Sequence, residues 1–189
     1  DVESRGLGDV YKRQEEVDVK MQTHIPVFTE VEDKEIVGDS ENKQYNFLLE
    51  GDNLHSLKLL EKTHKGKIDV IYIDPPYNTG SKDFVYNDSI IDGNDGYRHS
   101  KWLSFIAARL LVAKNLLSAT GMIMISINDV ELYSLKLLCD SIFGESNYLA
   151  NIIWQSTPGS NTGLDIKTVT EYVLCYACLL YTSPSPRDS

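Results

Sequence analysis

Residues 68–88 read IDVIYIDPPYNTGSKDFVYND, in which an apolar, β-branched run ends at an aspartate, two prolines and a tyrosine. The run does not alternate with polar residues, which is typical of a strand buried on both faces of a parallel sheet. Proline fixes φ at about −65° and has no N–H to donate, so Pro75 and Pro76 end the strand and stiffen the turn. The stretch therefore predicts a buried strand and a rigid turn that fixes Asp74 and Tyr77.

Strand and helix patterns alternate on both sides of this stretch. Strands are predicted at 45–49, 68–73, 122–127, 148–155 and 171–177, and helices are predicted after Asp52 or Asn53, over 100–118 and after Asn128. The polar segment after Tyr77 is predicted to be a loop by composition. The alternation predicts the α/β class, with a mostly parallel sheet and flanking helices.

Local signals set the expected helix ends. The helix over 100–118 has an apolar stripe made of Trp102, Ile106, Leu110 and Ala113, with Leu117 extending it. Gly121 is expected to break this pattern before the next strand. Asn128 and Glu131, three residues apart, resemble a capping box at the start of the following helix.

Length and composition suit one domain with a sizeable core, since 42% of the 189 residues are hydrophobic. The formal net charge of -10 argues against broad attraction to nucleic acid but leaves a local basic groove open. No apolar run approaches a membrane span and no signal peptide opens the chain, so the cytoplasm is the expected compartment. Cys139 and Cys175 lie in apolar runs and are interpreted as core residues, with no metal-ligand spacing.

The turn at Asp74 has the character of a binding site. In open α/β sheets, ligands bind beyond the carboxyl ends of the strands. There the Asp74 carboxylate and nearby backbone carbonyls accept hydrogen bonds, and Tyr77 offers an aromatic face. Acceptors beside a stacking ring predict a holder for a planar group that bears an NH₂.

The motif DPPYNTG, followed by DFVYND, resembles the amino-group DNA methyltransferases. It is most similar to the N6-adenine enzymes whose catalytic motif precedes the cofactor motif, and among them to the modification subunit of type III restriction-modification systems. The resemblance continues through LLEGDNLHSLKLL, WLSFIAARLLVAKNLL, GMIMISINDVEL and IFGESNYLANIIWQ and covers about residues 46–177. It implies part of a Rossmann-like, S-adenosylmethionine-dependent methyltransferase fold.

The resemblance also implies a chemistry for the motif. A methyl group passes from S-adenosyl-L-methionine to the exocyclic nitrogen of an adenine flipped out of double-stranded DNA. Asp74 and the Pro75 carbonyl would accept the two N–H groups and stabilise the charge that develops on nitrogen. Tyr77 would stack on the base, Pro76 completes the rigid turn, and no metal is needed.

Further site residues carry two interpretations each. Phe84 and Tyr86 are candidates for lining the pocket that holds the flipped base. The alternative is that their rings pack on the core. Asp52 and Trp102 are candidates for cofactor binding. The alternatives are a helix N-cap for Asp52 and core packing for Trp102.

Three more polar residues near these elements are given simpler interpretations. His99 has no partner visible in the sequence and is interpreted as a surface or capping residue. Ser126 and Asn128 end a strand near the expected crevice, where capping explains Asn128.

The two ends fit no element of the domain. Residues 4–14, SRGLGDVYKRQ, and 178–189, CLLYTSPSPRDS, back-translate to a transposase sequencing adapter in its two orientations. We therefore interpret 1–14 and 178–189 as adapter-derived, 15–44 as an acidic lead-in, and 45–177 as the catalytic half of a methyltransferase domain.

The resemblance places the Phe-x-Gly-x-Gly cofactor loop and the target-recognition region downstream of Ala177. Nothing in this sequence matches that loop. We expect a fragment that is inactive, binds cofactor poorly and leaves an apolar edge or face exposed. The parent protein is expected to act on double-stranded DNA in a prokaryotic cytoplasm, to pair with a helicase–nuclease restriction subunit and to form a homodimer.

Other functions stay open at this stage. Cytosine-N4 methylation is the nearest, although those enzymes more often carry serine where Asp74 stands. Methylation of RNA or of a protein amide reuses the same acceptor and ring arrangement. A non-catalytic module that binds DNA or a partner is the alternative outside enzymes.

Overall fold

The structure is a computed structural model of the chain. It describes residues 27–31, 46–86, 89–155 and 170–178, with the backbone alone over 81–92. The chain forms two compact units, residues 1–59 and 60–189. The boundary falls inside the first helix of the described residues, Asn53–His64, and the turn at Asp74 lies in the second unit.

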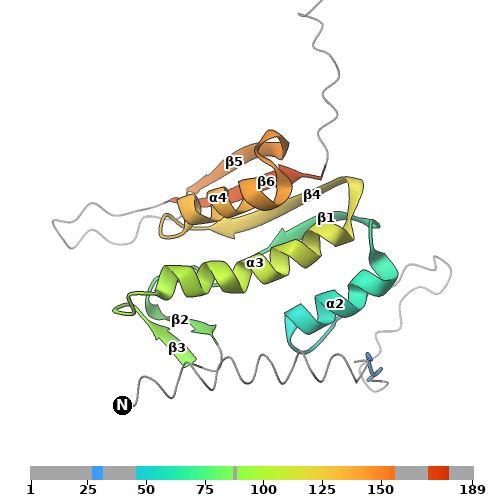
Figure 1. Cartoon of the computed structure of the whole chain (residues 1–189), viewed down its shortest axis with the longest axis horizontal. Helices are drawn as coiled ribbons and strands as arrows, with labels where there is room; N and C mark the ends of the chain where they lie inside the picture. The colour runs from blue at the N-terminus through green and yellow to red at the C-terminus, as the bar shows by residue number, and fades with distance from the viewer. Residues whose placement is uncertain (1–26, 32–45, 87–88, 156–169, 179–189) are drawn as a thin grey trace, which may run out of the picture. The chain divides into compact units, whose positions relative to one another are not determined.

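Helices and strands alternate along the described chain (Figure 1). In order they are α2 Asn53–His64, β1 Ile68–Ile73, β2 Ser81–Tyr86, β3 Ser89–Asp92, α3 Arg98–Leu116, β4 Leu117–Ile127, α4 Leu132–Phe143, the 3-10 turn η2 Glu145–Asn147, β5 Tyr148–Gln155 and β6 Thr170–Ala177. The α/β class is confirmed, as are the predicted strands that correspond to β1, β4, β5 and β6.

The main sheet is mixed rather than mostly parallel. Its strand order is β1-β4-β6-β5. The β1–β4 pairing is parallel, whereas β6 is antiparallel to both β4 and β5. Strands β1, β4 and β5 therefore share one direction, and β6 enters between β4 and β5 in reverse. The physical consequence is that β6 begins at the edge where β1 and β4 end.

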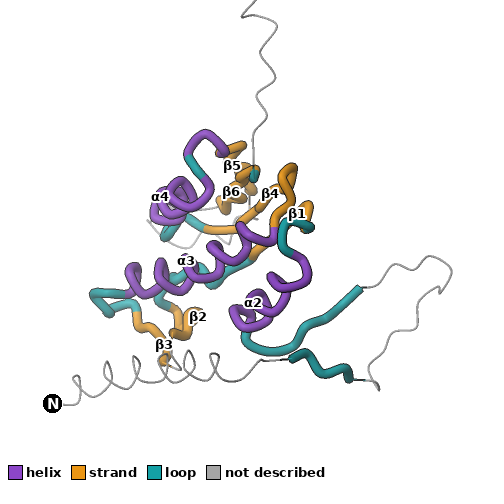
Figure 2. The backbone as a smooth tube through the Cα atoms, turned by 45° about the vertical axis from the view of Figure 1, so that its right-hand side comes forward, coloured by secondary structure: helices purple, strands orange, loops and turns teal. Residues whose placement is uncertain are grey.

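Helices α3 and α4 cover one face of this sheet (Figure 1), and Figure 2 shows the same arrangement after a 45° turn. The predicted stripe on α3 is confirmed, because Trp102, Ile106, Leu110 and Ala113 are all buried. They pack with Leu135 and Cys139 of α4, with Ile123, Ile125 and Ile127 of β4, and with Leu174 and Tyr176 of β6. Burial of apolar side chains between two layers is the main stabilisation of such a unit.

The other face of the sheet is open in the described part of the chain. Val70 and Tyr72 of β1 are 57% and 61% exposed, so this strand is not buried on both faces as its apolar run predicts. Ile153 and Trp154 of the edge strand β5 are 66% and 65% exposed. Ile153 and Trp154 are consecutive and point to opposite faces, so the expectation of an exposed apolar edge or face is confirmed for the face at Val70 and Tyr72 and for the edge at β5.

Several local predictions are wrong. Residues 46–50 form no strand, and Tyr45 lies outside the described residues. The polar segment after Tyr77 contains the β2–β3 hairpin instead of a continuous loop, because period-2 strands this short leave a weak signal among turn residues. Leu117 starts β4 rather than extending α3, and Gly121 lies inside β4.

The start of α4 also differs from the prediction. The helix begins at Leu132, with Glu131 at the N-cap position and no side-chain capping bond. Asn128 Oδ1 instead accepts a hydrogen bond from the Val130 N–H at 3.0 Å, so no capping box forms. The buried side chain of Glu131 is used elsewhere, as described below.

The two adapter-like ends lie outside the described residues apart from Cys178. In the described part of the chain, no helix is long and apolar enough to cross a membrane.

Candidate functional site

The D-P-P-Y turn lies at the carboxyl end of β1, as predicted. The parallel register sets Ile73 beside Ile125, so the end of β4 at Ser126 and Ile127 reaches the same edge. Asp74 is exposed there, while Pro75 is buried beneath it. The carboxylate is thus presented at the edge of the sheet by a turn with no freedom at its proline φ angles.

Trp102 connects this turn to the core. Its indole is fully buried, and its Nε1 donates a 2.6 Å hydrogen bond to the Pro76 carbonyl. The core-packing interpretation of Trp102 is therefore confirmed, and cofactor binding by this residue stays a prediction. Among the described residues, no hydrogen bond reaches the neighbouring Pro75 carbonyl, which is the acceptor that the sequence predicts for the substrate.

Tyr77 lies between two carboxylates. Its hydroxyl donates a long, 3.5 Å hydrogen bond to Glu171 Oε2. Burial raises the pKa of Tyr77 to about 12, and the charges of Asp74 and Glu171 act in the same direction. Glu171 reaches this edge because β6 runs antiparallel and begins where β1 ends. The result is a negative, aromatic-lined edge.

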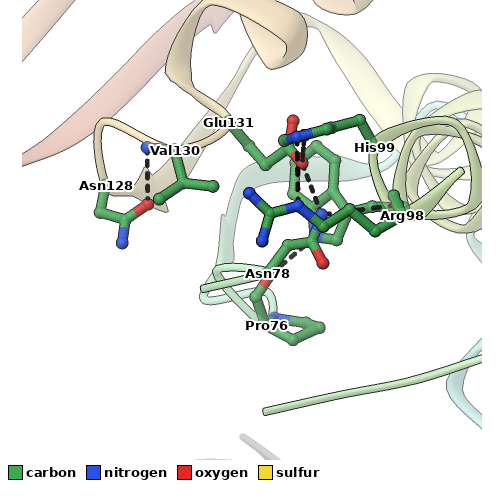
Figure 3. Close-up of polar contacts among 8 residues, drawn as sticks. Pro76, Asn78, Arg98, His99, Asn128, Val130 and Glu131 are labelled. Atoms are coloured by element: carbon green, nitrogen blue, oxygen red, sulfur yellow. Dashed lines mark hydrogen bonds and ion pairs between the residues drawn. The ribbon is translucent and has the colours of Figure 1, made fainter. Parts of the chain in front are cut away.

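A second group of polar side chains fixes the residue that follows Tyr77. Asn78 is 1% exposed and has a φ of 57°. Its Nδ2 donates a 2.6 Å hydrogen bond to Glu131 Oε1. His99 Nδ1 lies 2.5 Å from the same oxygen. Figure 3 shows the Glu131 carboxylate between the two side chains.

The other residues singled out from the sequence have mixed outcomes. His99 is exposed, as its surface interpretation predicts, and its Nδ1 is in addition paired with Glu131. Ser126 is buried and its hydroxyl shares a hydrogen bond with the Tyr72 hydroxyl. Asp52 Oδ1 accepts from the His55 N–H at 3.0 Å, which is an N-cap of α2.

For two predicted site residues the structure describes the backbone position but not the side chain. Phe84 and Tyr86 lie on β2 of the hairpin that follows the turn, and their side chains are outside the described part. Their assignment to a base pocket stays a prediction, as does cofactor binding by Asp52.

Three residues at this edge were not found by sequence reasoning: Asn78, Glu131 and Glu171. The signal for Asn78 was its place directly after the motif, in a residue type that tolerates positive φ. Glu131 resembled a helix-capping residue. Glu171 is the second residue of a predicted strand, and no sequence signal marks it as a site residue. Among the described residues, no group of three or more His, Cys, Asp or Glu is placed to hold a metal ion.

The arrangement suits recognition of a group that donates hydrogen bonds and gains positive charge. Asp74 and the Pro75 carbonyl are acceptors, Tyr77 supplies a ring, and Glu171 adds negative charge nearby. Acceptors fixed in advance stabilise developing positive charge without reorganisation at the moment of reaction.

Known proteins are similar to this chain over the region that contains the turn. The family described as DNA methylase matches residues 68–178. The chain is 40% identical over 163 residues to the type III restriction-modification enzyme StyLTI Mod subunit of Salmonella typhimurium, covering 73% of this chain and 25% of that relative. It is 38% identical over 169 residues to the EcoP15I Mod subunit of Escherichia coli, covering 77% of this chain and 26% of that relative.

A type II methyltransferase, M.KpnI of Klebsiella pneumoniae, is 43% identical over 129 residues, covering 67% of this chain and 31% of that relative. The chain thus spans about a quarter to a third of the length of these curated relatives. A solved DNA modification methylase of Thermus thermophilus, complexed with S-adenosyl-L-methionine, has a TM-score of 0.47 and 17% identity, covering 70% of this chain and 54% of that chain.

Proposed function

This chain belongs to the DNA methylase family, and we propose that it is the catalytic-motif segment of a longer adenine-N6 DNA methyltransferase of a restriction-modification system. The observation that carries the proposal is the D-P-P-Y turn at the carboxyl end of β1, with an exposed Asp74 and a Tyr77 ring beside it. The names of the curated relatives, which are modification subunits and a type II methyltransferase, support it.

The residues of the turn have distinct roles in this proposal. Asp74 and the Pro75 carbonyl accept the two N–H groups of the target amine, which turns its lone pair toward the methyl donor. Tyr77 stacks on the flipped base. The stiffness of the two prolines supplies alignment, and alignment of reactants is a large part of such catalysis.

The charges at the edge fit S-adenosyl-L-methionine as the cofactor. This cofactor supplies an electrophilic methyl group on a positively charged sulfonium. Burial is the largest cause that raises the pKa of Tyr77, and the negative charges of Asp74 and Glu171 act in the same direction. Those two negative charges favour a cation beside them. Tyr77 and Asp74 are the described residues proposed to face it, and Asp52 is a further candidate on the first unit.

Partners and compartment follow from the same proposal. The substrate is double-stranded DNA, and a helicase–nuclease restriction subunit and a second copy of the modification subunit are the proposed partners. The compartment is a prokaryotic cytoplasm. The 189-residue chain by itself is proposed to be inactive, since it spans only part of the length of its relatives.

The test uses the longer protein encoded at the genomic locus of this sequence. Purified protein is incubated with labelled S-adenosyl-L-methionine and double-stranded DNA, RNA or protein, and the DNA is digested to nucleosides. We expect N6-methyladenine, and we expect Asp74→Ala to lower the rate at least about 100-fold. Asp129→Asn, at an exposed acid near α4, is the matched control.

Each alternative has its own result in this assay. Detection of N4-methylcytosine would show that cytosine, not adenine, is the target base. Labelled methyl groups in RNA or protein would show that DNA is not the substrate. Cofactor-independent DNA binding with no transfer to any substrate would favour a non-catalytic module. Full activity in Asp74→Ala would remove the turn from the mechanism.

A further inference from the structure

We propose that Glu131 is a positioning residue for methyl transfer, acting through Asn78 and His99 to hold the D-P-P-Y turn. This inference rests on the proposed function for its catalytic meaning. The contacts themselves belong to the second unit of the chain and involve α3, α4 and the turn after β1.

The first step is the backbone at Asn78. Its φ of 57° is in the left-handed region, which asparagine adopts more readily than most residues other than glycine. Asn78 is also 1% exposed, so its side chain needs a partner inside the protein. Glu131 supplies that partner at 2.6 Å.

The second step is that the turn is held on both sides of Tyr77. On one side, Trp102 of α3 binds the Pro76 carbonyl. On the other side, Glu131 binds Asn78 and also His99. His99 and Trp102 are three residues apart on α3 and so share one helix face. The residues directly before and after Tyr77 are therefore both held, Pro76 through its carbonyl by Trp102 of α3 and Asn78 through its side chain by Glu131 at the N-cap of α4.

The third step is the protonation pattern around His99. The Nε of Arg98 donates to His99 Nε2 at 3.2 Å, which makes Nε2 an acceptor. His99 therefore donates through Nδ1 to Glu131 Oε1. The carboxylate thus accepts from two donors that come from separate parts of the chain, and its position is tied to both (Figure 3).

The fourth step is the free-energy cost of burying the Glu131 carboxylate. Its side chain is fully buried, and among the described residues its Oε2 has no hydrogen-bond partner. A buried carboxylate with an unpaired oxygen contributes little to stability, since apolar replacements at such places are often neutral. Geometry of the turn, rather than stability, is the effect that explains an acid at this position.

The experiment compares Glu131→Gln and Glu131→Leu, with Glu145→Gln at an exposed acid of η2 as the control. The glutamine amide oxygen can accept from both Asn78 and His99, whereas leucine accepts from neither. In the 189-residue chain, amide hydrogen exchange is measured by NMR for residues 77–80 and for Ile123 and Ile125 of the core. We expect exchange at residues 77–80 to be about tenfold faster in Glu131→Leu, with the core amides unchanged.

The longer protein gives the catalytic readout. We expect Glu131→Leu to lower kcat about 10- to 100-fold with little change in the KM for DNA, and Glu131→Gln to recover most of the rate. Asn78→Gly keeps the backbone conformation but removes the anchor. If both residues act through one contact, the variant with Asn78→Gly and Glu131→Leu is no slower than the slower single variant.

The outcomes separate the two proposals. Equal acceleration of exchange at the turn and in the core, or none at the turn, would overturn the positioning role. So would a loss of activity in Glu131→Leu that appears only in KM. A wild-type longer protein that transfers no methyl group to adenine would overturn the proposed function instead, while the exchange result still decides whether Glu131 holds the turn.

Discussion

The indole nitrogen of Trp102 lies 2.6 Å from the carbonyl oxygen of Pro76, so the largest fully buried side chain among the described residues is bonded directly to the D-P-P-Y turn. Packing and site geometry are therefore coupled at this residue. We therefore expect a change at Trp102 in the core beneath α3 to alter the turn as well.

Trp102→Phe tests this coupling. The smaller phenyl ring leaves part of the indole's space unfilled and the Pro76 carbonyl loses its donor, so we expect the free energy of unfolding to fall by about 2 kcal/mol or more. Urea denaturation of the chain measures this change. Trp154→Phe is the matched control, because Trp154 is 65% exposed on the edge strand. Equal stability losses in the two variants would contradict the role of the Pro76 bond.

Gly80→Ala tests the base of the hairpin that carries Phe84 and Tyr86. Gly80 has a φ of 84°, and a Cβ there would lie 2.8 Å from the Cα of Gly93. The backbone conformation and the overlap together should destabilise the chain by about 2 kcal/mol. Thermal unfolding measures the loss. Gly96→Ala is the control, since a Cβ at Gly96 meets nothing within 4 Å, and it should be close to neutral.

Tyr77→Phe tests the alkaline stability of the site. Burial, with Asp74 and Glu171, raises the pKa of Tyr77 from 10.0 to about 12. The folded chain holds this proton more tightly than the unfolded chain, so the stabilisation is complete below about pH 10 and is lost between about pH 10 and pH 12.

The free energy of unfolding should therefore fall less steeply over this range in Tyr77→Phe than in the wild type. Urea titrations at several pH values measure the slope. Tyr133→Phe, which alters an exposed ring, should leave the slope unchanged. A wild-type slope in Tyr77→Phe would show that this hydroxyl is not the group concerned.

Tyr176→Phe tests the polar contact beneath α4. The Tyr176 hydroxyl donates to Asp140 Oδ1 at 2.7 Å. Burial opposes ionisation of Asp140, but the hydrogen bonds from Lys136 and Tyr176 outweigh it and lower the pKa of this carboxyl. Loss of one bond should reduce the free energy of unfolding at neutral pH by about 1–2 kcal/mol.

The acid dependence gives a second readout of the same variant. A lowered pKa contributes stability above the unfolded value, and that contribution is lost as pH falls through the folded value. Tyr176→Phe should therefore lose less stability on acidification than the wild type. Tyr97→Phe, at an exposed ring, is the control. An unchanged acid slope would assign the shift to Lys136 alone.

Much of the site could be predicted where its signals are local. An apolar run before two prolines specifies a strand and its end, since proline cannot continue the ladder. The stripe on α3 specifies which face is buried, because helical side chains recur about every 3.6 residues. These rules placed Asp74 and Tyr77 at the end of β1 and Trp102 in the core.

The rest depended on contacts between segments far apart in the chain. Glu131 looks like a capping residue until α4 is packed against α3, which sets its carboxylate beside Asn78 and His99. Glu171 joins Tyr77 only because β6 enters the sheet in reverse. No local pattern encodes strand direction or the partner of a buried acid.

The sequence by itself determined the strand, the stiff turn and the acceptors that the turn presents, because backbone dihedral limits and hydrophobic periodicity are properties of neighbouring residues. Only the tertiary structure decided which side chains hold that turn and which charges surround it. Hydrogen bonds and electrostatic fields act across a few ångströms of space, and that proximity is created by packing two helices on a sheet.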